Sequence, residues 1–133
     1  MSARISLVAA ALLGFFAVAL GAFGAHGLKS VLEPAMMQVW QTAVLYHLVH
    51  SVALLAVGIW HLQQPSVWLA RAALMLLVGT LLFSGSLYLM ALTGVRILGM
   101  ITPLGGVSWL IGWSMLMVAG LKTTSQTGIQ SDR

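Results

Sequence analysis

Residues 5–25 read ISLVAAALLGFFAVALGAFGA, and no residue in this stretch carries a charge. Three further uncharged runs cover residues 34–70, 72–95 and 97–121. Each run can hold the roughly 20 apolar residues that are needed to cross a bilayer. The sequence therefore predicts an all-α integral membrane protein, an antiparallel four-helix transmembrane bundle.

The composition of the chain argues against most soluble and enzymatic classes. Charged residues make up only 6% of it, whereas a soluble domain carries about 25%. The Lys and Arg residues are scattered singly, so no basic stripe exists for nucleic acid. The lack of cysteine excludes thiol chemistry, and the only acids, Glu33 and Asp132, form no catalytic carboxylate pair. We expect no enzymatic activity, no metal and no cofactor.

The connectors between the runs set the expected helix boundaries. Pro34 and Pro103 fit the first turn of a helix, and Trp40 and Trp60 match the aromatic belts at the two membrane surfaces. The first run is longer than the roughly 7–15 residues of a signal-peptide core, so we expect it to be retained as a helix. The helices are expected at residues 5–24, 35–62, 67–92 and 102–121, in a single domain over 1–122, with a short polar cytoplasmic tail at 123–133.

Small residues recur on one face of two predicted helices. In the first helix they are spaced by three and four residues; they are Ala10, Gly14, Ala17, Gly21 and Gly24. The fourth helix carries a shorter set, namely Gly105, Ser108 and Gly112. Small side chains let two helix backbones approach closely in lipid. We therefore predict that these faces are packing seams, with Gly14, Gly21 and Gly112 at helix contacts inside the protein.

The distribution of positive charge predicts the orientation in the membrane. With four crossings both termini share one side, which holds Arg4, Arg71, Lys122 and Arg133. The opposite side holds Lys29 and Arg96, with Glu33 beside them. Because cytoplasmic loops carry an excess of Lys and Arg, we expect both termini to be cytoplasmic.

Several motifs spread over the chain are similar to those of one family. They are LGAFGAH at 20–26, WQT at 40–42 with Tyr46 and His50, FSGSLY at 83–88, TPLGGVS at 102–108 and GW at 112–113. In combination they resemble the YgdD-like proteins, grouped as domain of unknown function 423. The resemblance implies a multi-pass, four-helix protein of the bacterial inner membrane whose biochemical role is not established. In the family pattern the position after Tyr46 is open to other residues, which weakens a functional role for His47.

Nearly all polar side chains within the membrane fall in the half away from the termini. At 1.5 Å rise per residue, His50 lies about 15 Å past Trp40, near the midplane, and His47 about 10 Å past it. The candidate buried polar cluster comprises His26, His47, His50, Ser84, Ser86, Tyr88 and Thr102. Because lipid offers imidazole no partner, we expect His50 to point inward and to bond to the third or fourth helix, with Ser84, Ser86 or Tyr88 favoured.

Three interpretations of this cluster are open. Its members can hydrogen-bond across helices as structural contacts, or they can form a ligand or proton site, because ionisable residues inside membranes are often functional. A metal or haem site is the third interpretation. It is weak, because His47 and His50 share one helix and a zinc site usually takes three or four protein ligands.

We expect a small non-enzymatic protein of the lipid bilayer that binds a partner protein, a lipid or a small hydrophobic ligand. The alternative is a small channel or proton-coupled transporter that uses a membrane-buried histidine, His50, as its protonatable group. No acid lies within the expected helices, which counts against a proton-coupled exporter. A homodimer, or a complex with another membrane protein, is compatible with either function.

Overall fold

The computed structural model describes the backbone of residues 1–130 and the side chains of residues 1–123. Four long helices make up most of this range: α1 (Ala3–Phe23), α2 (Pro34–Gln63), α3 (Val67–Thr93) and α4 (Thr102–Gln130). By length and apolar composition, all four can cross a membrane. The predicted all-α fold with four membrane-spanning helices is confirmed.

Local sequence signals account for where the helices begin and end. The hydroxyl groups of Ser2 and Ser66 accept hydrogen bonds from backbone N–H groups in the first turns of α1 and α3, which caps both helices. Pro34 begins α2, where its missing N–H leaves no hydrogen bond unmade. Gly94 ends α3 with a φ of 72°, a left-handed conformation that glycine adopts without a steric penalty.

α4 is longer than the sequence analysis expected. The first three helices begin and end within two residues of the expected bounds, but α4 continues past residue 121 to Gln130. All three prolines of the chain lie earlier, so no residue in this segment forces the helix to stop. The expected tail, 123–133, therefore starts as helix, and residues 131–133 lie outside the described part of the chain.

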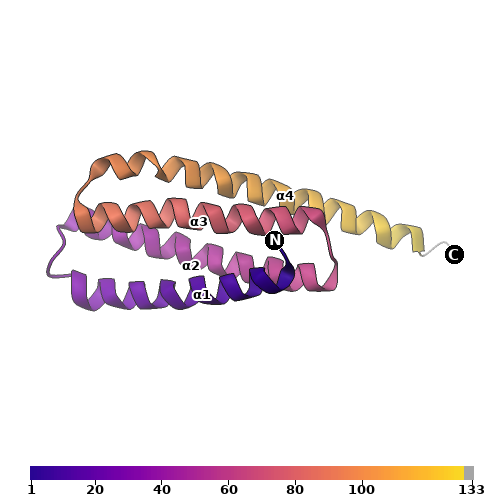
Figure 1. Ribbon diagram of the computed structural model, residues 1–133, viewed down its shortest axis with the longest axis horizontal. Helices are drawn as coiled ribbons and strands as arrows, with labels where there is room; N and C mark the ends of the chain where they lie inside the picture. Colours follow the sequence, from indigo (N-terminus) through magenta and orange to yellow (C-terminus); the bar gives the residue numbers. More distant parts are fainter. Residues whose placement is uncertain (131–133) are drawn as a thin grey trace.

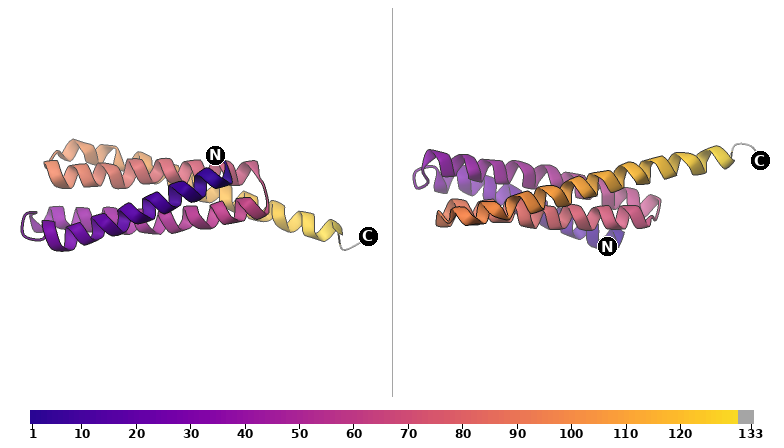
Figure 2. Two further views of the ribbon diagram at one scale, coloured as in Figure 1. Left: turned by 60° about the horizontal axis from the view of Figure 1, so that its bottom comes forward. Right: turned by 90° about the horizontal axis from the view of Figure 1, so that it is seen from above.

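The helices run antiparallel in chain order, and each packs along the next (Figure 1). α2 and α3 form the central pair; among the described residues, no Cα atom of α1 comes within 8 Å of one in α4. α4 crosses the other helices obliquely (Figure 2), and its tryptophan side chains reach α2. The N-terminus and the C-terminal part of α4 lie at the same end of the molecule (Figure 1).

A glycine and a tryptophan build the junction between α1 and α2. α1 passes into a π-helical turn, Gly24–Leu28, and the indole N–H of Trp40 donates to the carbonyl of Leu20 at 3.0 Å. A Cβ atom on Gly24 would overlap the Trp40 ring, so the missing side chain makes room for the indole. Trp40 is consequently only 2% exposed and does not belong to a lipid-facing aromatic belt, contrary to the prediction.

The small-residue face of α4 packs closely on α3. A Cβ atom on Gly105 would lie 2.5 Å from the backbone nitrogen of Phe83, and one on Gly112 would lie 3.2 Å from the Cβ atom of Met75. Between them, the Ser108 hydroxyl donates to the carbonyl of Met75 at 2.8 Å. These residues bring two backbones together and add a hydrogen bond between the helices.

The small residues of α1 are less uniform. Ala10 and Ala17 are buried, and a Cβ atom on Gly21 would lie 3.2 Å from a valine of α2. Gly14 departs from the prediction, because a Cβ atom there would meet no heavy atom within 4 Å. Gly14 lies at the edge of the packed face that carries Ala10 and Ala17, and the adjacent Leu13 contacts the core.

Large apolar side chains fill the space between the helices and also cover the outside. Leu54, Leu69 and Leu76 are at most 1% exposed, and Trp109 of α4 is 5% exposed. The Trp109 ring lies against Gly79, where a Cβ atom would overlap it. Many Ile, Val, Leu and Phe side chains point outward, as helices in a hydrocarbon solvent require.

Candidate functional site

His47 lies on the side of α2 that faces α3. Its Nδ1 atom is 3.0 Å from the hydroxyl oxygen of Tyr88, and the residue is 5% exposed. The hydroxyl of Ser51 donates to the backbone carbonyl of His47 at 2.6 Å. The second ring nitrogen of His47, Nε2, is buried and bonds to no residue whose side chain is described. One nitrogen of this imidazole is therefore left without a partner.

A cleft of about 210 Å³ lies beside the His47–Tyr88 pair, between α1, α2 and α3. Its polar lining consists of these two residues with Thr80 and Ser84. The Thr80 hydroxyl donates to the carbonyl four residues earlier, and the Ser84 hydroxyl donates to the carbonyl of Ala43 on α2, both at 2.9 Å. Both hydroxyl protons are thus used in bonds to the backbone.

Ser86 and Thr102 form a separate polar contact between α3 and the start of α4. Their hydroxyl oxygens lie 2.8 Å apart. The Ser86 oxygen also lies 2.9 Å from the carbonyl oxygen of Phe83. This contact ties the first residue of α4 to α3 and satisfies both hydroxyls.

His50 lies on another side of α2 and contacts α4. Its Nδ1 atom is 2.9 Å from the carbonyl oxygen of Tyr46, and its Nε2 atom is 3.4 Å from the indole nitrogen of Trp113. A carbonyl only accepts and an indole N–H only donates. Nδ1 therefore carries the proton and Nε2 the lone pair, which makes the ring neutral with both nitrogens engaged. The ring also stacks on Trp109, with centroids 3.7 Å apart and planes within 5°.

The structure divides the predicted polar cluster into separate contacts. His50 has its partner on α4, but none of Ser84, Ser86 and Tyr88 bonds to it. A serine hydroxyl is short and bonds to a carbonyl close by, whereas an indole on α4 is long enough to reach α2. His26 is exposed in the π-helical turn after α1.

The geometry gives no support to a metal or haem site. Among the described residues, no three His, Cys, Asp or Glu side chains lie where they could hold one metal ion. His47 and His50 share α2, but their ring nitrogens face Tyr88 on α3 and Trp113 on α4 respectively.

Rings from three helices meet around His50. They are Tyr46 and His50 from α2, Phe83 from α3, and Trp109 and Trp113 from α4. Tyr46 and Trp109 are nearly parallel, at 14° with centroids 5.6 Å apart, and the centroids of Phe83 and Trp109 are 4.5 Å apart. These rings line a groove of about 490 Å³, here termed the aromatic groove.

Tyr46 lines the aromatic groove, and its hydroxyl has no hydrogen-bond partner among the described side chains. The residue is 42% exposed. A hydroxyl placed in hydrocarbon without a partner is unfavourable by several kcal/mol. One residue that lines the groove therefore carries a free hydrogen-bond donor.

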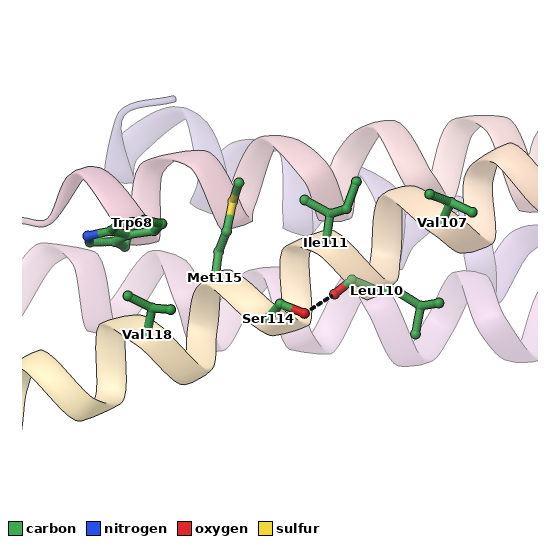
Figure 3. A pocket seen from close by; sticks show the side chains of 7 residues that line it. All are labelled: Trp68, Val107, Leu110, Ile111, Ser114, Met115 and Val118. Carbon is green, nitrogen blue, oxygen red and sulfur yellow. Dashed lines mark hydrogen bonds between the residues drawn. The ribbon is translucent and has the colours of Figure 1, made fainter.

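A shallower furrow of about 350 Å³ lies on the outer face of α4 (Figure 3). Its lining comes from Trp68 of α3 and from Val107, Leu110, Ile111, Ser114, Met115 and Val118 of α4. The Ser114 hydroxyl donates to the carbonyl of Leu110 at 2.8 Å (Figure 3). Since this hydroxyl is satisfied within the helix, the furrow is a surface that lipid tails can cover.

The model of one protein family, described as "Protein of unknown function (DUF423)", matches residues 20–106. The chain belongs to this family. The "UPF0382 inner membrane protein YgdD" of Escherichia coli (strain K12) is 40% identical over 122 residues, covering 92% of this chain and 93% of the relative. The "UPF0382 membrane protein YwdK" of Bacillus subtilis (strain 168) is 40% identical over 120 residues, covering 90% of this chain and 98% of the relative.

A DUF423 relative from Staphylococcus epidermidis, "UPF0382 membrane protein SERP0230", is 44% identical over 119 residues, covering 90% of this chain and 97% of the relative. No solved structure matches the chain significantly. The names of these relatives state a membrane location and no activity. They agree with the four membrane-spanning helices of this DUF423 member.

The sequence analysis of this DUF423 protein missed the aromatic groove, although a signal for it exists. Tyr46 and His50 are four residues apart, as are Trp109 and Trp113, which places each pair on one face of its helix. The aromatic face of α4 could have been recognised in this way. The contact of this aromatic face with α2, across α3, is a tertiary feature that residue spacing does not predict.

Proposed function

We propose that this protein binds a small hydrophobic molecule of the bilayer in the aromatic groove and catalyses no reaction. The observation that carries the proposal is a set of stacked rings that line one groove, among them Tyr46, whose hydroxyl has no partner among the described side chains. Ligand sites are mostly apolar clefts of roughly 300–1,000 Å³ with a few placed polar groups. The aromatic groove, at about 490 Å³, falls in this range.

The lining of the groove indicates the chemistry of the ligand. Aromatic side chains favour stacking or edge contacts with another flat ring, and the Tyr46 hydroxyl can donate to an oxygen. Tyr46 and His50 lie near the middle of α2, so the groove is reached from the hydrocarbon region of the membrane and not from the headgroups. The expected ligand is a neutral, membrane-soluble ring compound that carries an oxygen acceptor.

We also propose that the protein lies in the bacterial inner membrane with both termini in the cytoplasm. The name of the Escherichia coli relative supports the inner membrane. The end that holds the N-terminus carries Arg4, Arg71 and Lys122, and the other end carries Lys29 and Arg96. The excess of positive charge at the terminal end supports a cytoplasmic location.

The alternative function, a channel or transporter in which His50 titrates, receives less support from the geometry. Both ring nitrogens of His50 are engaged, and its ring is stacked on Trp109. The polar side chains near it form separate pairs, with no row that crosses the membrane among the described residues. Association with a second copy or another membrane protein stays a prediction.

The proposal is tested by filling the aromatic groove. Gly106 lines it, and a Cβ atom there would meet no heavy atom within 4 Å, so Gly106→Leu can occupy the groove without displacing the backbone. Gly14→Leu is the matched control, because Gly14 has the same open space but lines none of the described grooves. Each protein is purified in mild detergent, and the molecules extracted from it are quantified by mass spectrometry.

We expect a neutral ring compound to accompany the wild type and Gly14→Leu. Gly106→Leu should retain about tenfold less of it, which corresponds to about 1.4 kcal/mol of lost binding, and Tyr46→Phe should retain less of any species with an oxygen acceptor. Equal amounts of the same bulk lipids on all four proteins would show that the groove is only a lipid-facing surface.

A further inference from the structure

The cleft between α1, α2 and α3 is lined by His47, whose Nε2 atom is buried and has no partner among the described side chains. The residue is 5% exposed, so water from outside the membrane does not reach the ring. An unsatisfied polar atom buried in protein is unfavourable by about 1–3 kcal/mol. A group that bonds to Nε2 would remove this penalty.

The bond between His47 and Tyr88 indicates which kind of group that is. If the Tyr88 hydroxyl accepts from Nδ1, both its own proton and the lone pair on Nε2 lack partners. If the hydroxyl donates to Nδ1, only an N–H group at Nε2 lacks one. The second arrangement leaves fewer unsatisfied groups, so Nε2 carries the proton. A molecule that reaches Nε2 from the cleft therefore needs a hydrogen-bond acceptor.

We propose that this cleft is a second binding site, for a small neutral molecule whose carbonyl oxygen accepts from Nε2 of His47. The site is separate from the aromatic groove and does not depend on the function proposed for it. An apolar protein cavity of about 150 Å³ is large enough to bind benzene. The cleft measures about 210 Å³, so it has room for one ring with a carbonyl group.

The position of the cleft indicates where the molecule comes from. His47 lies near the middle of α2, whereas lipid ester groups lie at the edges of a hydrocarbon core about 30 Å thick. The carbonyl therefore belongs to a compound dissolved in the bilayer. Phe16 of α1 and Leu81 of α3 line the cleft and are 52% and 59% exposed. Their side chains face lipid and can turn to admit a ligand to the covered Nε2 atom.

The site is tested with acetophenone, an aromatic ketone, and with isopropylbenzene, which has a similar shape but no acceptor. The protein is labelled with ¹⁵N-histidine and placed in lipid nanodiscs, and His47→Gln identifies the resonances of His47 by their loss. We expect acetophenone to shift the Nε2 resonance of His47 until it saturates. Isopropylbenzene should need roughly tenfold more compound for any change, the equivalent of one lost hydrogen bond of about 1.4 kcal/mol.

Two glycine variants show whether the shift arises in this cleft. Gly85 lines it, and a Cβ atom there would meet no heavy atom within 4 Å. Gly85→Leu should weaken acetophenone binding by about tenfold, and Gly85→Ala is the smaller variant if the leucine impairs folding. Gly106→Leu, which fills the aromatic groove instead, should leave the His47 shift unchanged.

Four outcomes would overturn the proposal. Equal responses to both compounds would show an apolar cleft, and a shift that never saturates would show partition into the bilayer alone. A shift that survives Gly85→Leu would place the binding elsewhere. An Nε2 proton that exchanges with bulk water at the same rate with and without acetophenone would show that the ketone does not accept its hydrogen bond.

Discussion

The two histidines of α2 show how differently one side chain can be used three residues apart. The ring of His50 donates to a carbonyl, accepts from an indole and stacks on Trp109. The ring of His47 has one partner and one unsatisfied nitrogen. The first ring is a complete structural contact, and the second leaves one nitrogen without a partner among the described side chains. The exposed fractions of His47 and His50 are 5% and 6%. The two histidines therefore differ in their hydrogen-bond partners and not in their exposure.

The contribution of His50 to stability can be divided by two substitutions. His50→Phe keeps a flat ring against Trp109 but loses the bond to Tyr46 within α2 and the bond to Trp113 on α4. The second is interhelical, and such bonds in membranes contribute roughly 0.6–2 kcal/mol. His50→Ala loses the stacked ring as well, a further loss of about 0.5–1.5 kcal/mol. Thermal unfolding in detergent should therefore rank wild type above His50→Phe and His50→Ala last. His26→Ala, at an exposed position, should unfold like the wild type; equal values for the two His50 variants would mean that stacking adds nothing.

Among the helices, the contact between α3 and α4 depends on which of two adjacent glycines faces the neighbour. A Cβ atom on Gly105 would lie 2.5 Å from the backbone of Phe83, and one on Gly106 would meet nothing within 4 Å. Gly105→Ala should destabilise the protein by about 1–3 kcal/mol, because the backbone of α3 cannot move aside easily. Gly106→Ala should stabilise it by about 0.5–1 kcal/mol, because alanine loses less entropy in a helix. Unfolding in detergent measures both, and effects of the same sign would contradict this packing.

The left-handed conformation of Gly94 at the end of α3 can be tested by substitution. Gly94 has a φ of 72°, a conformation that places the Cβ atom of other residues too close to the following carbonyl. Gly94→Ala should lower the stability by about 1–2 kcal/mol, and Gly94→Asn should lower it less, because asparagine tolerates this region better. Gly85→Ala, in the middle of α3, is the control for the loss of a glycine as such. If Gly94→Ala unfolds like Gly85→Ala, the left-handed cap is not formed.

The elements also show what could be predicted from the sequence and what could not. The uncharged runs predict the number of helices, and residues such as Pro34 and Gly94 predict most of their ends. Both features depend on local chemistry. Depth in the membrane likewise follows from counting residues along a helix. The direction in which a side chain points cannot be obtained from this count, because it depends on how neighbouring helices rotate and cross. For this reason Trp40 was expected at the lipid surface and Gly14 at a contact. His50 bonds to one of the two helices expected for it, α4, but to none of the three favoured side chains.

For the molecule as a whole, charge is divided unevenly between the two ends. The terminal end has three Lys and Arg side chains within the described residues, and one of them, Lys122, lies 4.8 Å from the centre of the Trp68 ring. The far end has Lys29 and Arg96, whose charge is partly offset by Glu33. The excess at the terminal end is small, so the orientation proposed here should respond to a few added charges.

The orientation of the chain, and its response to added charge, can be measured by cysteine labelling. The chain has no cysteine, so single cysteines at the exposed positions Ser30 and Gln63 report each end separately. In spheroplasts, a membrane-impermeant maleimide should label Ser30→Cys and should reach Gln63→Cys only after the membrane is opened. Changing Val31 and Leu32 to lysine adds two positive charges beside Lys29, which gives that end four Lys and Arg side chains against the three within the described terminal end. In this background the labelling of Gln63→Cys before opening should rise, because the translocated end now carries the charge that favours the cytoplasm. If Gln63→Cys is already labelled in the original chain, the orientation is the reverse of the one proposed.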